Sequence, residues 1–213
     1  MKKFLIAACV LLVSLCSLAR AEEKPVVFLA KKWTVALPDA KFSVAKSDNE
    51  TGVILADRGY LIADWKDGGI LDFDLMFLGK PYLETEEQQI SNAPHFSIGL
   101  RTKGEYLPER PFELKGDRSI RLRLAGGQAL YEKPSNKKDE DAERLADKRF
   151  KALEPYVWHH IVFADSGKWC SLKINDVLVI DEDLDAPEKD NKIMLGSREF
   201  NAGQNWIILR QHR

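Results

Sequence analysis

Apolar and polar residues alternate with a period of two through most of this 213-residue chain. The clearest example lies within 69–78, where every second residue from Leu71 to Phe77 is Leu or Phe and two of the residues between them are Asp. Successive side chains of a strand point to opposite faces, so this pattern predicts strands with one buried face. Comparable segments occur at 26–30, 41–46, 53–57, 59–64, 95–101, 120–124, 156–164, 169–175, 177–181, 192–196 and 205–211. About a dozen short strands separated by turn residues predict an all-β sandwich or jelly roll rather than βαβ units.

One segment, 139–153, departs from the alternation. Its apolar residues recur at helical spacing among charged ones, which predicts a short inserted helix packed on one edge of the sandwich. The residues of this stripe are Ala142, Leu145, Ala146, Phe150 and Leu153. A solvated charged loop is the alternative.

The first 21 residues have the three parts of an export signal. Lys2 and Lys3 precede an apolar run at 4–18, and Ala19-Arg20-Ala21 matches a signal-peptidase cleavage site. The run is short for a membrane span, so we expect cleavage and no stable membrane insertion afterwards, with a retained anchor as the alternative. The sequence thus predicts a signal peptide at 1–21, a single domain at 22–213, and a periplasmic or secreted protein.

Composition narrows the partners of the mature chain. Residues 22–213 contain 29 basic and 33 acidic residues, a net charge of −4, which argues against nucleic acid or an anionic membrane as the partner. Cys170 is the one cysteine left after cleavage, so no intramolecular disulfide can form. The absence of a disulfide favours a bacterial periplasm over the eukaryotic extracellular space, where small proteins are rich in disulfides. The apolar surroundings of Cys170 predict a buried structural thiol.

The stretch from Val157 to Leu184 resembles the paired strands of concanavalin A-like (laminin-G-like) sandwiches. A Trp-His pair opens one strand, a polar turn follows, and the next strand ends in Asn175-Asp176 before a third strand. Asn and Asp tolerate the left-handed conformations of a tight hairpin turn. The resemblance implies a concanavalin A-like β-sandwich, or jelly roll, carrying the inserted helix.

Within that superfamily the chain is most similar to the 3-keto-disaccharide hydrolase domain of exported bacterial proteins. The segments that carry this resemblance are Trp33, Gly59-Tyr60-Leu61, Leu71-Asp72-Phe73-Asp74-Leu75, 92–101 and 205–210. It implies hydrolysis of an oxidised disaccharide or another glycoside. The nearest match to the paired glutamates of laminarinase-type glucanases is 183–188, which Pro187 interrupts. Whether the protein is an enzyme therefore stays open. The alternatives are a non-catalytic glycan- or protein-binding module of the bacterial envelope, and a structural envelope protein.

The candidate site is the polar face of the strand that begins at His95. That strand also carries Ser97 and Arg101, and it adjoins a long loop, 79–94. Histidine, arginine and carboxylate side chains on one face could bind a saccharide or hold a divalent ion through oxygen ligands. The predicted ligand-binding residues are His95, Arg101, Arg123, Trp65, Tyr106 and Glu84. An ordinary solvated sheet face is the alternative.

No catalytic residue and no metal ligand is assigned from the sequence, and the cofactor is left open, with a divalent cation such as calcium as the candidate. His159 and His160 are adjacent, so a strand would point them to opposite faces, one in the core and one on the surface. Arg121 and Arg123 could bind sugar hydroxyls or a carboxylate, or else pair with Asp72 and Asp74 on a neighbouring strand.

Overall fold

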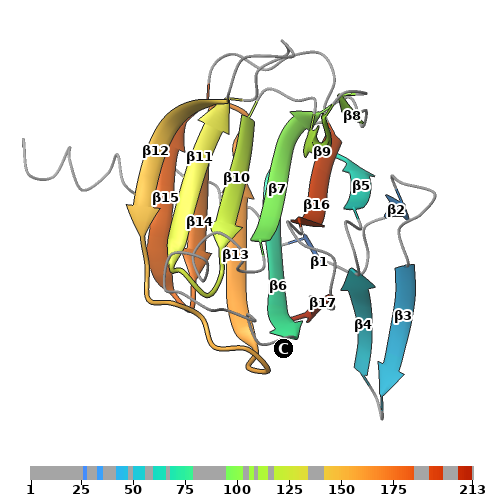
Figure 1. The fold of residues 1–213 in the computed structure, drawn as a ribbon. Helices are drawn as coiled ribbons and strands as arrows, with labels where there is room; N and C mark the ends of the chain where they lie inside the picture. The colour runs from blue at the N-terminus through green and yellow to red at the C-terminus, as the bar shows by residue number, and fades with distance from the viewer. Residues whose placement is uncertain are drawn as a thin grey trace, which may run out of the picture.

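Two sheets with mainly antiparallel pairing stack face to face in the part of the protein that the computed structural model describes (Figure 1). The structure describes residues 26–27, 33–35, 42–47, 50–55, 60–65, 68–78, 95–102, 106–107, 110–114, 118–133, 142–184, 192–198 and 206–212. Every regular element within these ranges is a strand. The predicted all-β sandwich is therefore confirmed.

The eight-stranded sheet has the order β15-β14-β13-β6-β17-β4-β3, and β1 pairs in parallel with β6. Its long central strand β6 is flanked by β13 on one side and by β17 on the other. The bounds are β1 Val26–Val27, β3 Phe42–Ser47, β4 Glu50–Leu55, β6 Gly69–Leu78, β13 His159–Asp165, β14 Trp169–Ile174, β15 Val177–Asp183 and β17 Trp206–Gln211.

The seven-stranded sheet, in front in Figure 1, has the order β12-β11-β10-β7-β16-β5-β2. A separate pair is formed by β8 Tyr106–Leu107 and β9 Arg110–Leu114, which lie between β7 and β10 in the sequence. The bounds in the seven-stranded sheet are β2 Thr34–Val35, β5 Tyr60–Asp64, β7 His95–Thr102, β10 Arg118–Arg123, β11 Gln128–Lys133, β12 Glu143–Arg149 and β16 Lys192–Arg198.

The core lies between the sheets and is built from the alternating apolar residues. The odd-numbered residues from Leu71 to Phe77 on β6 are fully buried, and so are the apolar residues of β7 and β10. Phe73 and Phe96 meet edge to face across the two sheets, with ring centroids 6.0 Å apart. Each such side chain contributes about 1.5–3 kcal/mol when removed from water. The period-two pattern thus predicted the buried face correctly.

The predicted hairpin in the stretch 157–184 is also confirmed. β13, β14 and β15 pair in sequence, and the β14–β15 turn has φ of 49° at Asn175 and 65° at Asp176. Two successive positive φ values are what a two-residue turn needs to match the twist of the strands it joins. Cys170 is buried on β14, as expected.

The predicted helix at 139–153 is wrong for the residues that the structure describes. Residues 143–149 form β12, which pairs with β11 at the edge of the seven-stranded sheet. Ala146 and Phe150 pack against the core as the helical pattern suggested, but Leu145 is exposed. Pairing with β11 satisfies the backbone groups that the two strands direct at each other. The charges of this segment suit the open side of an edge strand, where they discourage pairing with another chain. The described residues contain no helix with the length and apolarity needed to cross a bilayer.

Candidate functional site

The outer face of β10, β11 and β12 carries a connected group of polar side chains, which we call the arginine face. The strand register puts Arg123 directly opposite His95 of β7 on one side and Gln128 of β11 on the other. Arg121 likewise lies between Ser97 and Leu130. Directly opposed residues of antiparallel strands share a face, so these side chains lie side by side.

A chain of hydrogen bonds crosses the three strands of the arginine face. Arg123 donates from Nη1 to Oε1 of Gln128 at 2.9 Å. Gln128 donates from Nε2 to both carboxylate oxygens of Asp147, at 2.8 and 2.9 Å, and Arg144 donates to the same carboxylate at 3.3 Å. One buried amide therefore connects a guanidinium in the middle of the sheet to a carboxylate on its edge.

A second contact on this face is the ion pair of Arg121 and Glu132. Nη2 of Arg121 lies 2.6 Å from Oε1 of Glu132, and the two side chains are 18% and 8% exposed. Burial, followed by the positive charges of Arg121 and Arg144, lowers the pKa of Arg123. Within the part of the chain that the structure describes, the Nε atoms of Arg121 and Arg123 have no hydrogen-bond partner. These two Nε atoms are buried, so donors for a ligand would come from the η nitrogens of the two partly exposed guanidinium groups.

The structure brings together two of the predicted ligand-binding residues, His95 and Arg123, as directly opposed residues on neighbouring strands. His95 is buried on this face. Tyr106 belongs to β8, but its side chain lies outside what the structure describes, and Glu84 lies outside the described residues altogether. Ligand binding by these four residues stays a prediction.

The other two predicted residues, Arg101 and Trp65, do not lie on the arginine face. Both are buried and bind the carboxylate of Asp165, the last residue of β13. Trp65 donates from Nε1 at 3.0 Å and Arg101 from Nη2 at 3.3 Å. Arg101 also donates to the carbonyl of Gly167 at 2.7 Å. These contacts connect the two sheets, so the prediction that Arg101 and Trp65 share the face of His95 is wrong. Ligand binding by Arg101 and Trp65 stays a prediction.

A β-bulge explains the different direction of Arg101. On β16, Lys192 pairs with Thr102 and Ile193 pairs with Leu100, so Arg101 is an extra residue in β7. Its φ of 53° is in the left-handed region. A bulge of this kind bends the strand and redirects side chains, which breaks the alternation that would have put Arg101 beside Ser97.

The predicted alternative partners of Arg121 and Arg123 are also wrong. Asp72 and Asp74 lie on β6 in the other sheet, whereas the arginines bind Glu132 and Gln128 of β11. Sequence reasoning missed Gln128, Glu132 and Asp147. Gln128 and Glu132 enclose the short apolar run 129–131, and a buried run of this length is the signal that could have identified β11.

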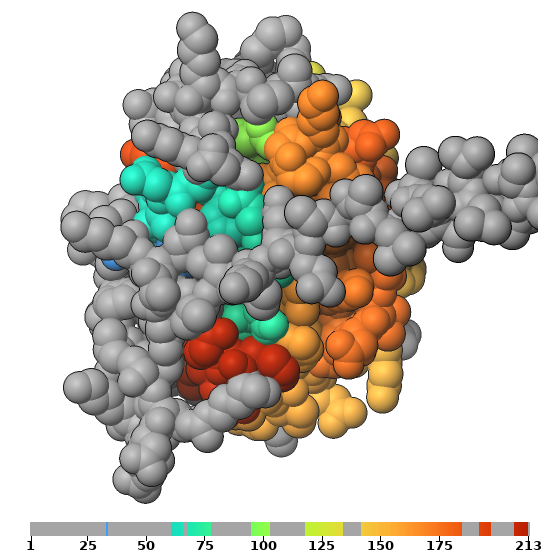
Figure 2. Space-filling model, turned by 180° about the vertical axis from the view of Figure 1, so that it is seen from behind, coloured from blue at the N-terminus to red at the C-terminus, as the bar shows by residue number. Residues whose placement is uncertain are grey.

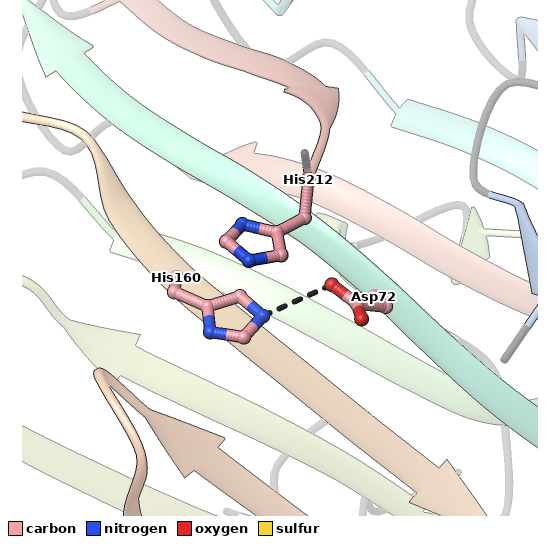
Figure 3. A group of neighbouring side chains, drawn as sticks. All are labelled: Asp72, His160 and His212. Carbon is pink, nitrogen blue, oxygen red and sulfur yellow. Dashed lines mark hydrogen bonds and ion pairs between the residues drawn. The ribbon is translucent and has the colours of Figure 1, made fainter.

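A second polar cluster lies on the outer face of the eight-stranded sheet. His159 is buried and stacks on Phe77, while His160 points outward, as predicted for adjacent histidines of a strand. His160 meets Asp72 of β6 and His212, which follows β17 (Figure 3). These three residues offer ligand atoms that lie within 4.8 Å of one another. Imidazole and carboxylate groups are donors that a metal ion could use.

Comparison with known proteins supports the fold. No protein-family model matches the sequence, and no curated protein has a matching sequence. Among solved structures, the carbohydrate recognition domain of Emp46p in its metal-free form matches with a TM-score of 0.55 and 12% identity, over 84% of this chain and 87% of that chain. Its potassium-bound form gives a TM-score of 0.54 over the same shares.

A Bacillus subtilis protein of unknown function with a galectin-like fold also matches. Its TM-score is 0.51 at 10% identity, over 84% of this chain and 87% of that chain. At such identities the matches establish a shared sandwich architecture, and any function has to be argued from the residues of this chain.

Proposed function

We propose that this protein is an exported saccharide-binding module whose ligand lies on the arginine face. The observation that carries the proposal is the hydrogen-bonded chain from Arg123 through Gln128 to Asp147. It holds donors and acceptors in fixed positions across three neighbouring strands.

The chemistry of this face suits a polyhydroxylated ligand. A sugar hydroxyl both donates and accepts, so it needs a surface that presents both kinds of group. Arg121 and Arg123 supply donors, while Glu132 and Asp147 supply acceptors. Because Arg121 and Arg123 are only partly exposed, a hydrogen bond made there would be shielded from competing water.

The geometry favours binding over hydrolysis. A glycosidase of the two-carboxylate type needs one carboxyl group that can deliver a proton and a second that can attack or activate water. Glu132 is already ion-paired with Arg121, and Asp147 accepts from Gln128 and Arg144. The resemblance to the 3-keto-disaccharide hydrolases keeps hydrolysis as an outcome that the experiment must test.

The shared fold lends support, because one of the matched domains is described as a carbohydrate recognition domain. Export is also part of the proposal. Residues 1–21 have the composition of a signal peptide, and they lie outside the described residues. Export would restrict the ligand to molecules of the cell envelope or the exterior.

The test is a binding and turnover screen of residues 22–213 against glycosides, oligosaccharides and 3-keto-disaccharides. We expect saturable binding to at least one saccharide without release of product. Arg123→Met should weaken this binding by tenfold or more, since a hydrogen bond to a charged group contributes about 1.5–3 kcal/mol. Lys151→Gln, which removes an exposed cation beyond β12, is the matched control and should bind normally.

Three outcomes would contradict the proposal. Binding of no saccharide would exclude a saccharide-binding module. Binding that Arg123→Met leaves unchanged would place the ligand elsewhere. Release of product from a 3-keto-disaccharide would replace the binding module with a hydrolase.

A further inference from the structure

The outer face of the eight-stranded sheet holds two stacked imidazoles beside a carboxylate. The rings of His160 and His212 are 3.7 Å apart between centroids and 13° from parallel. Nε2 of His160 lies 3.0 Å from Oδ1 of Asp72 (Figure 3). Seen from behind, the C-terminal segment that contains His212 lies beside β6 and the strands of the 142–184 stretch (Figure 2). Three distant parts of the sequence thus meet on one surface.

The surroundings hold both histidines in place. Nδ1 of His212 lies 2.6 Å from Oδ1 of Asp74, and Oδ2 of the same carboxylate accepts from Nε of Arg210 at 2.9 Å. With Asp74 accepting the proton on Nδ1, the other ring nitrogen of His212 has a free lone pair. The backbone N–H of His160 donates to the side chain of Asn175 at 2.9 Å. A carboxylate behind a histidine is the usual support of a metal-binding imidazole.

We propose that Asp72, His160 and His212 bind one divalent transition-metal ion of the zinc class. Their ligand atoms lie within 4.8 Å of one another. Tetrahedral zinc with bonds of about 2.0–2.2 Å separates its ligand atoms by roughly 3.3 Å. Side-chain rotations therefore complete the site when they bring these atoms closer by up to about 1.5 Å and tilt the two stacked rings towards one point. The contact of Asp72 with His160 already has a nearly suitable length, at 3.0 Å.

The donor set identifies the class of metal. Two imidazole nitrogens and one carboxylate suit zinc and similar ions, whereas calcium takes oxygen ligands. Local charge also favours a cation, because Asp72, Asp74 and the exposed Asp176 near His160 outnumber the one guanidinium of Arg210. Three protein ligands leave a fourth position for water or for an external group.

This site is independent of the arginine face, because the two lie on the outer faces of different sheets. Loss of metal binding therefore leaves the saccharide proposal untouched, and loss of saccharide binding leaves the metal site untouched.

The test uses residues 22–213, purified without a polyhistidine tag and stripped of metal. Calorimetry with Zn²⁺ should give one equivalent bound, and a parallel titration with Ca²⁺ should give no comparable binding. His160→Asn and His212→Asn should each lower zinc affinity by more than tenfold. Asp74→Asn should lower it by about 10–100-fold through the loss of support for His212. Asp183→Asn, an exposed carboxylate on β15, is the control and should bind normally.

The chain contains an internal control, because only two of its four histidines belong to the site. In nitrogen-detected NMR of the imidazoles, Zn²⁺ should shift the resonances of His160 and His212 and leave those of His95 and His159 in place. Absence of stoichiometric zinc binding would overturn the proposal. So would zinc binding that survives the double substitution of His160 and His212, or a shift confined to the other two histidines.

Discussion

Replacing Asp165 by Asn would remove the charge from the buried junction between the sheets while keeping the shape of the side chain. Its carboxylate accepts hydrogen bonds from Trp65, from Arg101 and from the backbone N–H of Gly167, the last at 2.7 Å. Arg101 and Asp165 are only 4% and 1% exposed. The substitution leaves a buried guanidinium without its counter-charge, and it puts an amide donor where the carboxylate accepted.

The expected loss in the free energy of unfolding is about 3 kcal/mol. Removing one partner of a buried ion pair costs about 3–5 kcal/mol, because the other charge stays buried and uncompensated. The lower end applies here, since Arg101 keeps its 2.7 Å hydrogen bond to the carbonyl of Gly167. A domain of this size has a total stability of about 5–15 kcal/mol, so Asp165→Asn should still fold.

Urea unfolding monitored by tryptophan fluorescence and by circular dichroism measures this loss. Asp176→Asn, at an exposed turn position, is the control and should stay within about 0.5 kcal/mol of the parent protein. Combining Asp165→Asn with Arg101→Met should recover part of the lost stability, because no buried charge then remains unpaired. A loss below about 1 kcal/mol in the free energy of unfolding of Asp165→Asn would refute the structural junction. A double variant whose loss equals the sum of the losses of the two single variants would refute it as well.

Two further substitutions test other parts of the sandwich. Gly127 has a φ of 58°, and a β-carbon there would lie 2.3 Å from the carbonyl oxygen of Phe150. Gly127→Ala should therefore lower the free energy of unfolding, measured in urea, by at least about 2 kcal/mol, and Gly126→Ala should lower it by less. Burial and the nearby Asp165 carboxylate raise the pKa of Cys170 from 9.0 to about 12, so its thiol should resist Ellman's reagent at pH 8 until the protein unfolds. Because the unfolded thiol ionises first, stability should fall as pH rises from 9 towards 12, by about 1.4 kcal/mol at pH 10, and Cys170→Ala should lack this part of the pH dependence. Rapid labelling of the folded thiol would contradict its burial.

The sequence predicted those features that depend on neighbouring residues. The alternation on β6 predicted its buried face, and Asn175-Asp176 predicted a tight turn whose two φ values are positive. Both features are local, because the period of a strand and the conformational freedom of Asn and Asp act within a few residues.

The helix at 139–153 failed because its alternative partner lies elsewhere in the chain. The segment has an apolar spacing that a helix could use, but β11 offered unpaired backbone groups and a place for Ala146 and Phe150 against the core. Tertiary pairing of this kind overrides local propensity. Because of this error the arginine face was not predicted, since Asp147 was assigned to a helix rather than to the strand beside Gln128.

Arg101 shows why a site cannot be assigned from alternation alone. In an uninterrupted strand it would share the outward face of His95 and Ser97, but one extra residue opposite β16 turns it towards Asp165. Arginine, aspartate and tryptophan are equally suited to a sugar site and to a buried junction, so residue type does not separate the two roles. The two roles are separated by burial and by the partners inside the sandwich. Nη2 of the buried Arg101 donates to a carboxylate and to a carbonyl inside the sandwich, whereas Arg123 lies partly exposed on a polar surface. A ligand can therefore reach Arg123 without disturbing the contacts that hold the two sheets together.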